Sequence, residues 1–114
     1  MNFKFPKSAR LLSRFEYKTL YKKGTTWKGS SLIITYCLIG KNQAPKLGLT
    51  VSRRFGKAIE RNRFKRAIRE GFRLLYQKFP PTIALNVQPN IENQSITNRA
   101  AQVELKIFLS SLSS

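Results

Sequence analysis

The sequence lacks histidine and aspartate entirely, and its only acidic residues are five glutamates. Ser-His-Asp and Cys-His nucleophilic sites, and most carboxylate metal sites, are therefore excluded. Cys37 is the single cysteine, so neither an internal disulfide nor a multi-cysteine metal site can form. Its place in the apolar run at 32–39 predicts a buried thiol. We expect no catalytic side chain and no cofactor or metal held by the protein itself.

Long apolar segments are also missing. No stretch approaches the roughly 18 to 20 apolar residues that span a bilayer. The first residues, 1–12, show no apolar signal core followed by a small-residue cleavage site. We expect no membrane partner and a cytoplasmic location.

Positive charge is abundant instead. Against five acidic residues stand 22 lysines and arginines, a net charge of +17 over 114 residues, while 41% of the residues are hydrophobic. Such a chain is long enough for one modest core, and its charge implies a polyanionic partner. We expect a single domain over 1–114, with a flexible basic lead-in at 1–12 and a frayed tail at 110–114.

Much of this charge lies in the segment 57–73, KAIERNRFKRAIREGFR. At about 100° per residue, a helix here has an apolar arc formed by Phe64, Ala67, Ile68, Gly71, Phe72 and Leu75. Its other arc carries Arg61, Asn62, Lys65, Arg66, Arg69 and Arg73. These like charges repel each other unless a polyanion binds and neutralises them. The alternative, a merely solvated face, usually alternates signs, and only Glu60 and Glu70 dilute the positive charge here.

An N-terminal helix is predicted at 14–23. Ser13 and Glu16 have capping-box spacing, and Gly24 is placed to end the helix. Tyr17 and Tyr21 then lie on one face of it. Their rings either pack in the core or line a groove and stack on bases.

The strands come from β-branched and aromatic runs. After a turn at 25–26, a strand is predicted at 27–39, with the option of a short extra strand before Gly29. Following a connection at 40–45, residues 47–52 return as its antiparallel partner, and a further strand follows at 82–87. Alternation gives the first strand two faces, Leu32, Ile34 and Tyr36 on one and Ile33, Thr35 and Cys37 on the other.

Two more helices complete the predicted domain. One runs over 58–78, where Gly71 allows close packing on the sheet and Pro80 stops the helix. The other runs over 96–109 and is capped by Ser95. Its apolar stripe consists of Ile96, Ala100, Val103 and Ile107. This order of elements predicts an α+β domain with one sheet.

The basic residues point to RNA. Lysine and arginine contact phosphates without reading sequence, whereas Asn62, between Arg61 and Arg63, can recognise a base edge, a 2′-hydroxyl or a hydrated metal. A local hydrogen bond to the backbone is the alternative role of Asn62. Because neither a helix-turn-helix pair nor a zinc finger is found, structured or single-stranded RNA fits better than duplex DNA.

The segment LGLTVSRRFGKAIERNRFKRAIREGFR, at 47–73, resembles the signature of the bacterial ribonuclease P protein family. The resemblance extends upstream through RLLSRFEYKTLYKKGT at 10–25 and is weak after Pro80. It implies a single sheet of about four strands packed with three helices, in the order α-β-β-(β)-α-β-α. It also implies a left-handed βαβ crossover of the kind seen in ribosomal-protein-like folds, against the usual hand.

The resemblance also implies a function. In this family the RNA subunit is the catalyst, and its magnesium ions activate the water that cuts precursor tRNA at the mature 5′ end. The protein binds the 5′ leader between the sheet and the N-terminal helix and faces the RNA subunit with its Arg-Asn-Arg region. It thereby raises the affinity for substrate and for magnesium near the scissile bond. The implied partners are ribonuclease P RNA and precursor tRNA, with one protein per RNA.

Carried over by position, the leader-binding cleft consists of Tyr17, Tyr21, Ile33, Thr35 and Thr50. The family usually has phenylalanine at the two tyrosine positions. The residues expected to bind RNA are Ser52, Arg53, Arg54, Lys57, Arg61, Asn62, Arg63, Lys65, Arg66, Arg69 and Arg73. Two rival hypotheses are a ribosomal or assembly protein of similar architecture and a protein-only nuclease, the latter disfavoured by the missing histidine and aspartate.

Overall fold

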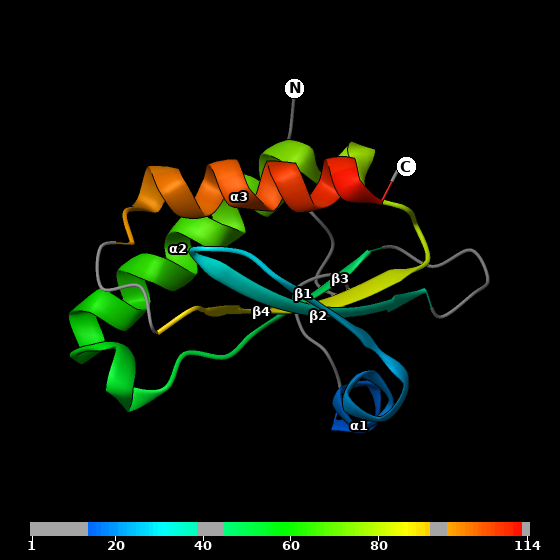
Figure 1. Ribbon diagram of the computed structural model, residues 1–114, viewed down its shortest axis with the longest axis horizontal. Coiled ribbons are helices and arrows are strands. Elements are labelled where there is room, and N and C mark those ends of the chain that lie inside the picture. The colour runs from blue at the N-terminus through cyan, green and yellow to red at the C-terminus, as the bar shows by residue number, and fades with distance from the viewer. Residues whose placement is uncertain (1–13, 39–44, 92–95, 113–114) are drawn as a thin grey trace.

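The computed structural model describes residues 14–38, 45–91 and 96–112, with the side chains from residue 17 onward. Its helices and strands are arranged as Figure 1 shows. In chain order they are α1 (Arg14–Lys23), β1 (Thr25–Lys28), β2 (Leu32–Leu38), β3 (Lys46–Leu49), α2 (Ala58–Leu75), β4 (Ile83–Pro89) and α3 (Asn98–Ser111). Two 3-10 segments, η2 (Arg53–Phe55) and η3 (Tyr76–Lys78), flank α2. The predicted α+β class, with three helices and a four-stranded sheet, is confirmed.

The sheet has the strand order β1-β2-β4-β3. β2 pairs antiparallel with β1 and β4, whereas β3 pairs parallel with β4. The prediction that 47–52 returns as the antiparallel partner of 27–39 is therefore wrong. β4 lies between them, because its nearly continuous apolar run suits a strand with neighbours on both sides and both faces covered. The unit β3-α2-β4 is the βαβ crossover that the resemblance implied, and its hand stays a prediction.

The predicted strand at 27–39 is two strands. Thr25 and Thr26, expected in a turn, belong to β1 and pair with Tyr36 and Thr35 of β2. The connection between the strands is tight, since the Gly29 N–H donates to the Leu32 carbonyl over 2.8 Å. The short extra strand before Gly29 was one of the two options left open by the sequence.

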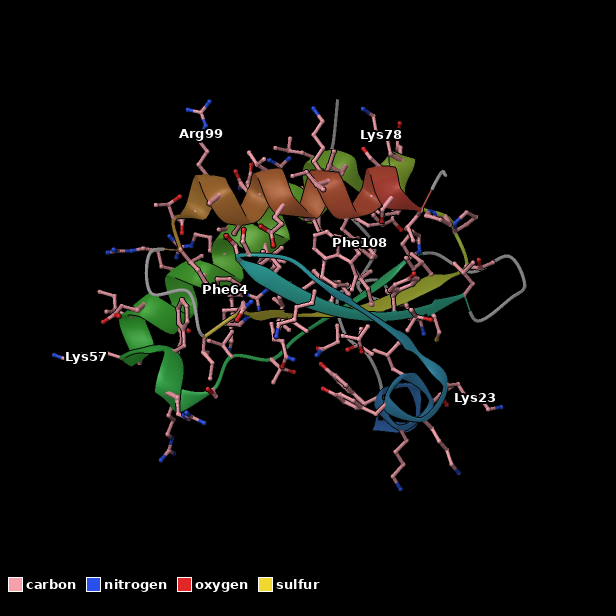
Figure 2. All side chains as sticks on the ribbon, viewed as in Figure 1. Lys23, Lys57, Phe64, Lys78, Arg99 and Phe108 are labelled. Atoms are coloured by element: carbon pink, nitrogen blue, oxygen red, sulfur yellow. The ribbon has the colours of Figure 1, made fainter. Side chains whose placement is uncertain are left out.

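The main core lies between the sheet and the two long helices. α2 and α3 cover one face of the sheet, and α1 lies against the other (Figure 1). Leu32 and Ile34 of β2 are buried with Phe72 of α2 and Phe108 of α3, and Figure 2 shows Phe108 between α3 and the sheet. On the opposite face, Leu20 of α1 packs on β4 in a second, smaller cluster. The predicted two faces of the strand at 32–37 are thereby confirmed.

α2 follows its prediction closely. Its buried residues are Phe64, Ala67, Ile68, Gly71 and Phe72, which are five of the six members of the predicted apolar arc, and the sixth, Leu75, is half-buried. The helix starts at Ala58 as predicted, and the last turn to Lys78 is 3-10 rather than α-helical. A Cβ at Gly71 would approach the side chains of Gln102 and Leu105 to 3.3 Å. The close packing at this glycine is therefore against α3, not against the sheet.

α3 departs from its prediction in start and face. The residue before its first turn is Thr97, whose hydroxyl accepts the Ala100 N–H over 3.0 Å, so Ser95 is not the cap. Val103 and Ile107 of the predicted apolar stripe are exposed. The buried face consists instead of Ala101, Glu104, Leu105, Phe108 and Leu109.

Several predictions fall outside the described residues. These are the lead-in at 1–12, the Ser13 cap and its Glu16 partner side chain, and the connection at 40–44. Ser95 itself also lies outside them, while α3 runs to Ser111, two residues beyond its predicted end.

Candidate nucleic-acid interface

The paired tyrosines of α1 form an open groove. Tyr17 and Tyr21 stack with ring centroids 6.4 Å apart and planes 16° from parallel. Together with Lys18 and Lys22 they line a hollow on the helix surface, which we call the tyrosine groove. Tyr21 is 60% exposed, so its ring is open to a ligand, whereas Tyr17 is half-buried. Tyr17 lines the groove and also packs against the cluster of Leu20 and Ala84.

The groove is tied to the sheet through Asn86 of β4. The Asn86 amide nitrogen donates to the Tyr21 hydroxyl over 3.3 Å, and its amide oxygen accepts from the Thr50 hydroxyl over 3.2 Å. Asn86 is only 1% exposed, and a buried amide is stable there because both its donor and its acceptor are used. The network holds the exposed Tyr21 ring in place over the sheet.

Tyr17 is anchored differently. Burial raises the pKa of its hydroxyl, nearby Tyr21 raises it further, and a hydrogen bond with the backbone of Leu49 lowers it. Because the net direction is upward, the phenol stays neutral at neutral pH. An uncharged ring beside lysines can approach a phosphate-bearing strand without added repulsion.

The remaining predicted cleft residues differ in availability. Thr50 is exposed and joins the Asn86 network. Ile33 is half-buried and pairs with Gln88 on the sheet face that carries α1. Thr35 pairs directly with Asn86 but is 7% exposed. Thr35 therefore shapes the floor beneath the network and offers little surface of its own.

The second predicted surface is the outer arc of α2 and the segment before it. Most of the predicted cationic and polar side chains here are exposed, and Figure 2 shows Lys57 extending away from the molecule. The exposed set, which we call the basic surface, is Ser52, Arg53, Arg54, Lys57, Asn62, Arg63, Arg66 and Arg69. The prediction that the apolar arc docks on the core while the cations face solvent holds for these residues.

Three other predicted cations are less available. Arg61 and Lys65 are half-buried, and the Arg61 Nε is buried without a hydrogen-bond partner within the described part of the chain. Arg73 is half-buried and forms an ion pair with Glu70. Its charge is thus partly neutralised within the helix.

Asn62 lies exposed among these cations. Its side chain makes no hydrogen bond across residues 17–38, 45–91 and 96–112. The alternative of a local bond to the backbone is therefore not what the structure has. The amide points to solvent with its donor and acceptor available.

Sequence reasoning missed Asn86, Lys18 and Lys22 as members of the tyrosine groove. A single amide inside the apolar run 83–87 is the signal that could have identified Asn86, since a buried amide needs partners. Lys18 and Lys22 flank the tyrosines at the helical spacing that puts neighbours on one face. Their positions relative to Tyr17 and Tyr21 could have identified them.

Among the described residues, no group of three or more His, Cys, Asp or Glu could hold a metal ion. Within the same ranges, no helix is both long and apolar enough to cross a membrane.

Comparison with known sequences gives a consistent result. The family model described as Ribonuclease P matches residues 5–113. The ribonuclease P protein component of Desulforapulum autotrophicum is 35% identical over 108 residues, covering 94% of this chain and 92% of that protein. The component from Finegoldia magna is 30% identical over 101 residues, covering 87% and 86%. A shorter match to the component of Chlamydia trachomatis, 37% identical over 75 residues, covers 66% of this chain and 62% of that protein.

Solved structures agree with the sequence matches. The RNase P protein of Staphylococcus aureus superposes with a TM-score of 0.81 at 25% identity, covering 93% of this chain and 96% of that one. The RNase P protein from Thermotoga maritima gives a TM-score of 0.75 at 27% identity, covering 88% and 94%.

Proposed function

The chain belongs to the ribonuclease P protein family, and we propose that it is the RNA-binding subunit that assists a catalytic RNA in removing the 5′ leader of precursor tRNA. The protein binds the RNA subunit with one surface and the leader with another. It acts in the cytoplasm, as one protein per RNA, and the bond-breaking groups belong to the RNA.

The basic surface is the part that we assign to the RNA subunit. Its side chains are exposed on one helix arc and on the segment before it, so several can reach phosphates of a folded RNA together. Phosphate contacts fix orientation without reading sequence. The exposed Asn62 amide, surrounded by arginines, adds a group that can bond a base edge or a 2′-hydroxyl.

The tyrosine groove is the part that we assign to the leader. The observation that carries this assignment is the exposed Tyr21 ring, held by Asn86 and stacked beside Tyr17. Proteins that bind single-stranded nucleic acid use aromatic rings to stack on bases and nearby cations to contact phosphates. The helix that carries the groove, α1, lies on the sheet face opposite α2 (Figure 1), so the two RNAs do not compete for one surface.

Magnesium is assigned to the RNA subunit. The described residues offer no cluster of acidic or other ligands suited to a metal ion. We propose that the protein raises magnesium affinity through the position in which it holds the substrate.

Reconstitution tests this proposal. We expect the chain, mixed with ribonuclease P RNA at low magnesium, to stimulate cleavage of precursor tRNA. Tyr21→Ala should weaken binding of leader-bearing precursor by about 1 to 3 kcal/mol, the usual worth of one stacked base, and leave the binding of mature tRNA unchanged.

Tyr21→Phe is the matched control, because it keeps the ring and removes only the hydroxyl that Asn86 contacts. Its leader affinity should stay much closer to that of the unaltered chain. Equal losses of precursor and mature tRNA binding in Tyr21→Ala would show that the ring serves the fold. No stimulation by the unaltered chain would remove the proposal as a whole and favour a ribosomal or assembly role.

A further inference from the structure

A second hollow lies away from the tyrosine groove, where the first turns of α2 meet η2 and the start of α3. Its volume is about 440 Å³, within the range of pockets that enclose small molecules. Its main lining residues are Arg54, Phe55, Glu60, Arg63, Phe64 and Asn98. We call it the α2–α3 pocket.

The floor of the pocket is aromatic. The rings of Phe55 and Phe64 lie 5.4 Å apart at 59°. Phe64 is only 3% exposed, whereas Phe55 is half-buried. Phe64 therefore supports Phe55, which can present part of its ring to a ligand. A flat ligand can gain stacking energy there.

The rim combines charges of both signs. Arg54 and Arg63 are exposed cations that line the pocket together with the Glu60 carboxylate. Although it shares the pocket with them, Glu60 forms no ion pair or hydrogen bond within the described ranges. Its carboxylate lies against Gly56, where a Cβ would collide with it. The pocket thus offers an acceptor and two donors at once.

This combination selects among ligands. A bare phosphate would gain from the two arginines but be repelled by the carboxylate. A nucleotide uses all three features, since its base can stack on an aromatic ring, its phosphate can bind arginine, and its edge N–H groups can donate to a carboxylate. Guanine fits a carboxylate best, because its N1–H and N2–H donors are adjacent and can bind both oxygens.

We infer that the α2–α3 pocket binds a single unpaired guanine nucleotide of the RNA partner. The base stacks on Phe55, its N–H edge donates to Glu60, and its phosphate lies between Arg54 and Arg63. Because the pocket shares Arg54 and Arg63 with the basic surface, the nucleotide would come from the RNA held there. The inference therefore rests on the proposed function for the source of the nucleotide, but not for the pocket's chemistry.

Titration of the full-length chain with mononucleotides tests the chemistry directly. We expect saturable binding of GMP, followed by amide chemical shifts at Phe55 and Phe64. AMP, UMP and inorganic phosphate should bind about ten-fold or more weakly, as expected when a two-point base contact is lost. Glu60→Gln should remove most of the preference for GMP over AMP. Equal binding of all four ligands would overturn the inference and indicate only surface attraction of phosphate.

A pocket-filling variant tests the site without changing its charge. Ile91 lines the pocket and is 39% exposed, so Ile91→Trp can occupy it while Arg54, Glu60 and Arg63 remain. We expect at least a ten-fold loss of GMP binding. Val103→Trp, at an exposed position of α3 that does not line the pocket, is the matched control and should bind GMP normally.

Two further measurements keep the result interpretable. Asn98→Trp fills the pocket from the exposed first residue of α3 and should reproduce the loss if Ile91→Trp unfolds the chain, as judged by circular dichroism. In the reconstituted complex, the filling variants should weaken binding of ribonuclease P RNA, whereas Val103→Trp should not. GMP binding without any stimulation of precursor cleavage would refute the proposed function alone. Stimulation of precursor cleavage without selective GMP binding would refute the pocket assignment alone.

Discussion

Asn86 links the strands of the groove region to α1 through a side-chain hydrogen bond. It lies on the central strand β4, pairs in register with Thr35 of β2 and Gly48 of β3, and bonds the side chains of Tyr21 and Thr50. An amide suits this place because it donates and accepts at once. An apolar side chain could bond neither hydroxyl.

Replacing Asn86 by leucine should therefore affect both stability and the groove. Asn86→Leu removes two part-buried side-chain hydrogen bonds, one to Tyr21 and one to Thr50. At about 0.5 to 1.5 kcal/mol each, their loss should lower the free energy of unfolding by about 1 to 3 kcal/mol, measured in urea. Leader affinity should fall with it, since Tyr21 loses its anchor. Gln88→Leu, two residues along the same strand and half-buried, is the control. Similar losses of stability and leader affinity in both variants would mean that the Asn86 hydrogen bonds do not anchor the groove.

Cys37 offers a test of burial on the face under α1. The thiol is half-buried rather than buried as predicted, and it packs with the Leu20 and Ala84 cluster. Burial raises the pKa of this thiol above its ordinary value, because the thiolate is poorly solvated there. At pH 8 a smaller share of this thiol is ionised than in an exposed cysteine.

The reaction of Cys37 with iodoacetamide should therefore be slow and shift to higher pH. Only the thiolate reacts, so the rate of the folded chain should rise through a midpoint at higher pH than that of the chain unfolded in urea, because burial raises the pKa of Cys37. The rate is followed by mass spectrometry across pH 7 to about 10.5, on either side of the usual cysteine pKa. Coinciding midpoints for the folded and unfolded chains would contradict the assignment.

At the scale of elements, α3 is held to the β1–β2 connection by one carboxylate. Glu104, 7% exposed, accepts the N–H groups of Ser31 and Leu32 over 2.8 Å each and the Ser30 hydroxyl over 2.9 Å. Three donors compensate the cost of burying the charge. A Cβ at Gly29 would collide with this carboxylate, so glycine at that position is part of the same contact.

Glu104→Gln should consequently destabilise the protein by about 1 to 3 kcal/mol, because bonds to an ionised acceptor exceed those to a neutral amide. Thermal unfolding measures the loss, and faster exchange of the Ser31 and Leu32 amides would locate it at the β1–β2 connection. Glu70→Gln, which removes the exposed ion pair with Arg73, should change stability by less than about 1 kcal/mol. A Tm for Glu104→Gln equal to that of Glu70→Gln would refute the role of Glu104.

The same glutamate explains why the face of α3 was not predictable from sequence. Two stripes compete on this helix, one through Val103 and Ile107 and one through Ala101, Leu105 and Phe108. Because an unpaired buried carboxylate is unfavourable, Glu104 argues against the second stripe. Its partners in the β1–β2 connection are more than 70 residues away in sequence, so only the fold reveals them. α2 posed no such problem, since all its cations lie on one arc.

At the scale of the whole molecule, strand pairing was the part that sequence could not determine. Residues 46–49 follow β2 in the chain, and a hairpin between them is the local solution. The central place goes to β4, which arrives only after the α2 crossover and has the more continuous apolar run. The local parts of the candidate site, the tyrosine pair and the basic arc, were predicted from the sequence. The Asn86 network was not predicted, because it depends on the position of β4 between β2 and β3.

Only the structure shows which of the cations on α2 are available to bind RNA. Arg66 is exposed on the outer arc of α2. Arg73, two turns further along the same helix, is half-buried and paired with Glu70. In the sequence the two arginines are equivalent members of the basic arc of this helix. Their contributions to RNA binding should differ, because a cation already paired within the protein releases fewer counterions on binding.

The salt dependence of binding to ribonuclease P RNA measures this difference. Arg66→Gln should lower the slope of log K against log salt by about 0.7 to 0.9, the value of one phosphate contact. Arg73→Gln should lower it by clearly less. Both variants remove one charge of the +17, so a general loss of net charge would change the two slopes equally. Equal slopes would therefore show that long-range charge governs binding, and a larger effect of Arg73→Gln would place the RNA on the other end of α2.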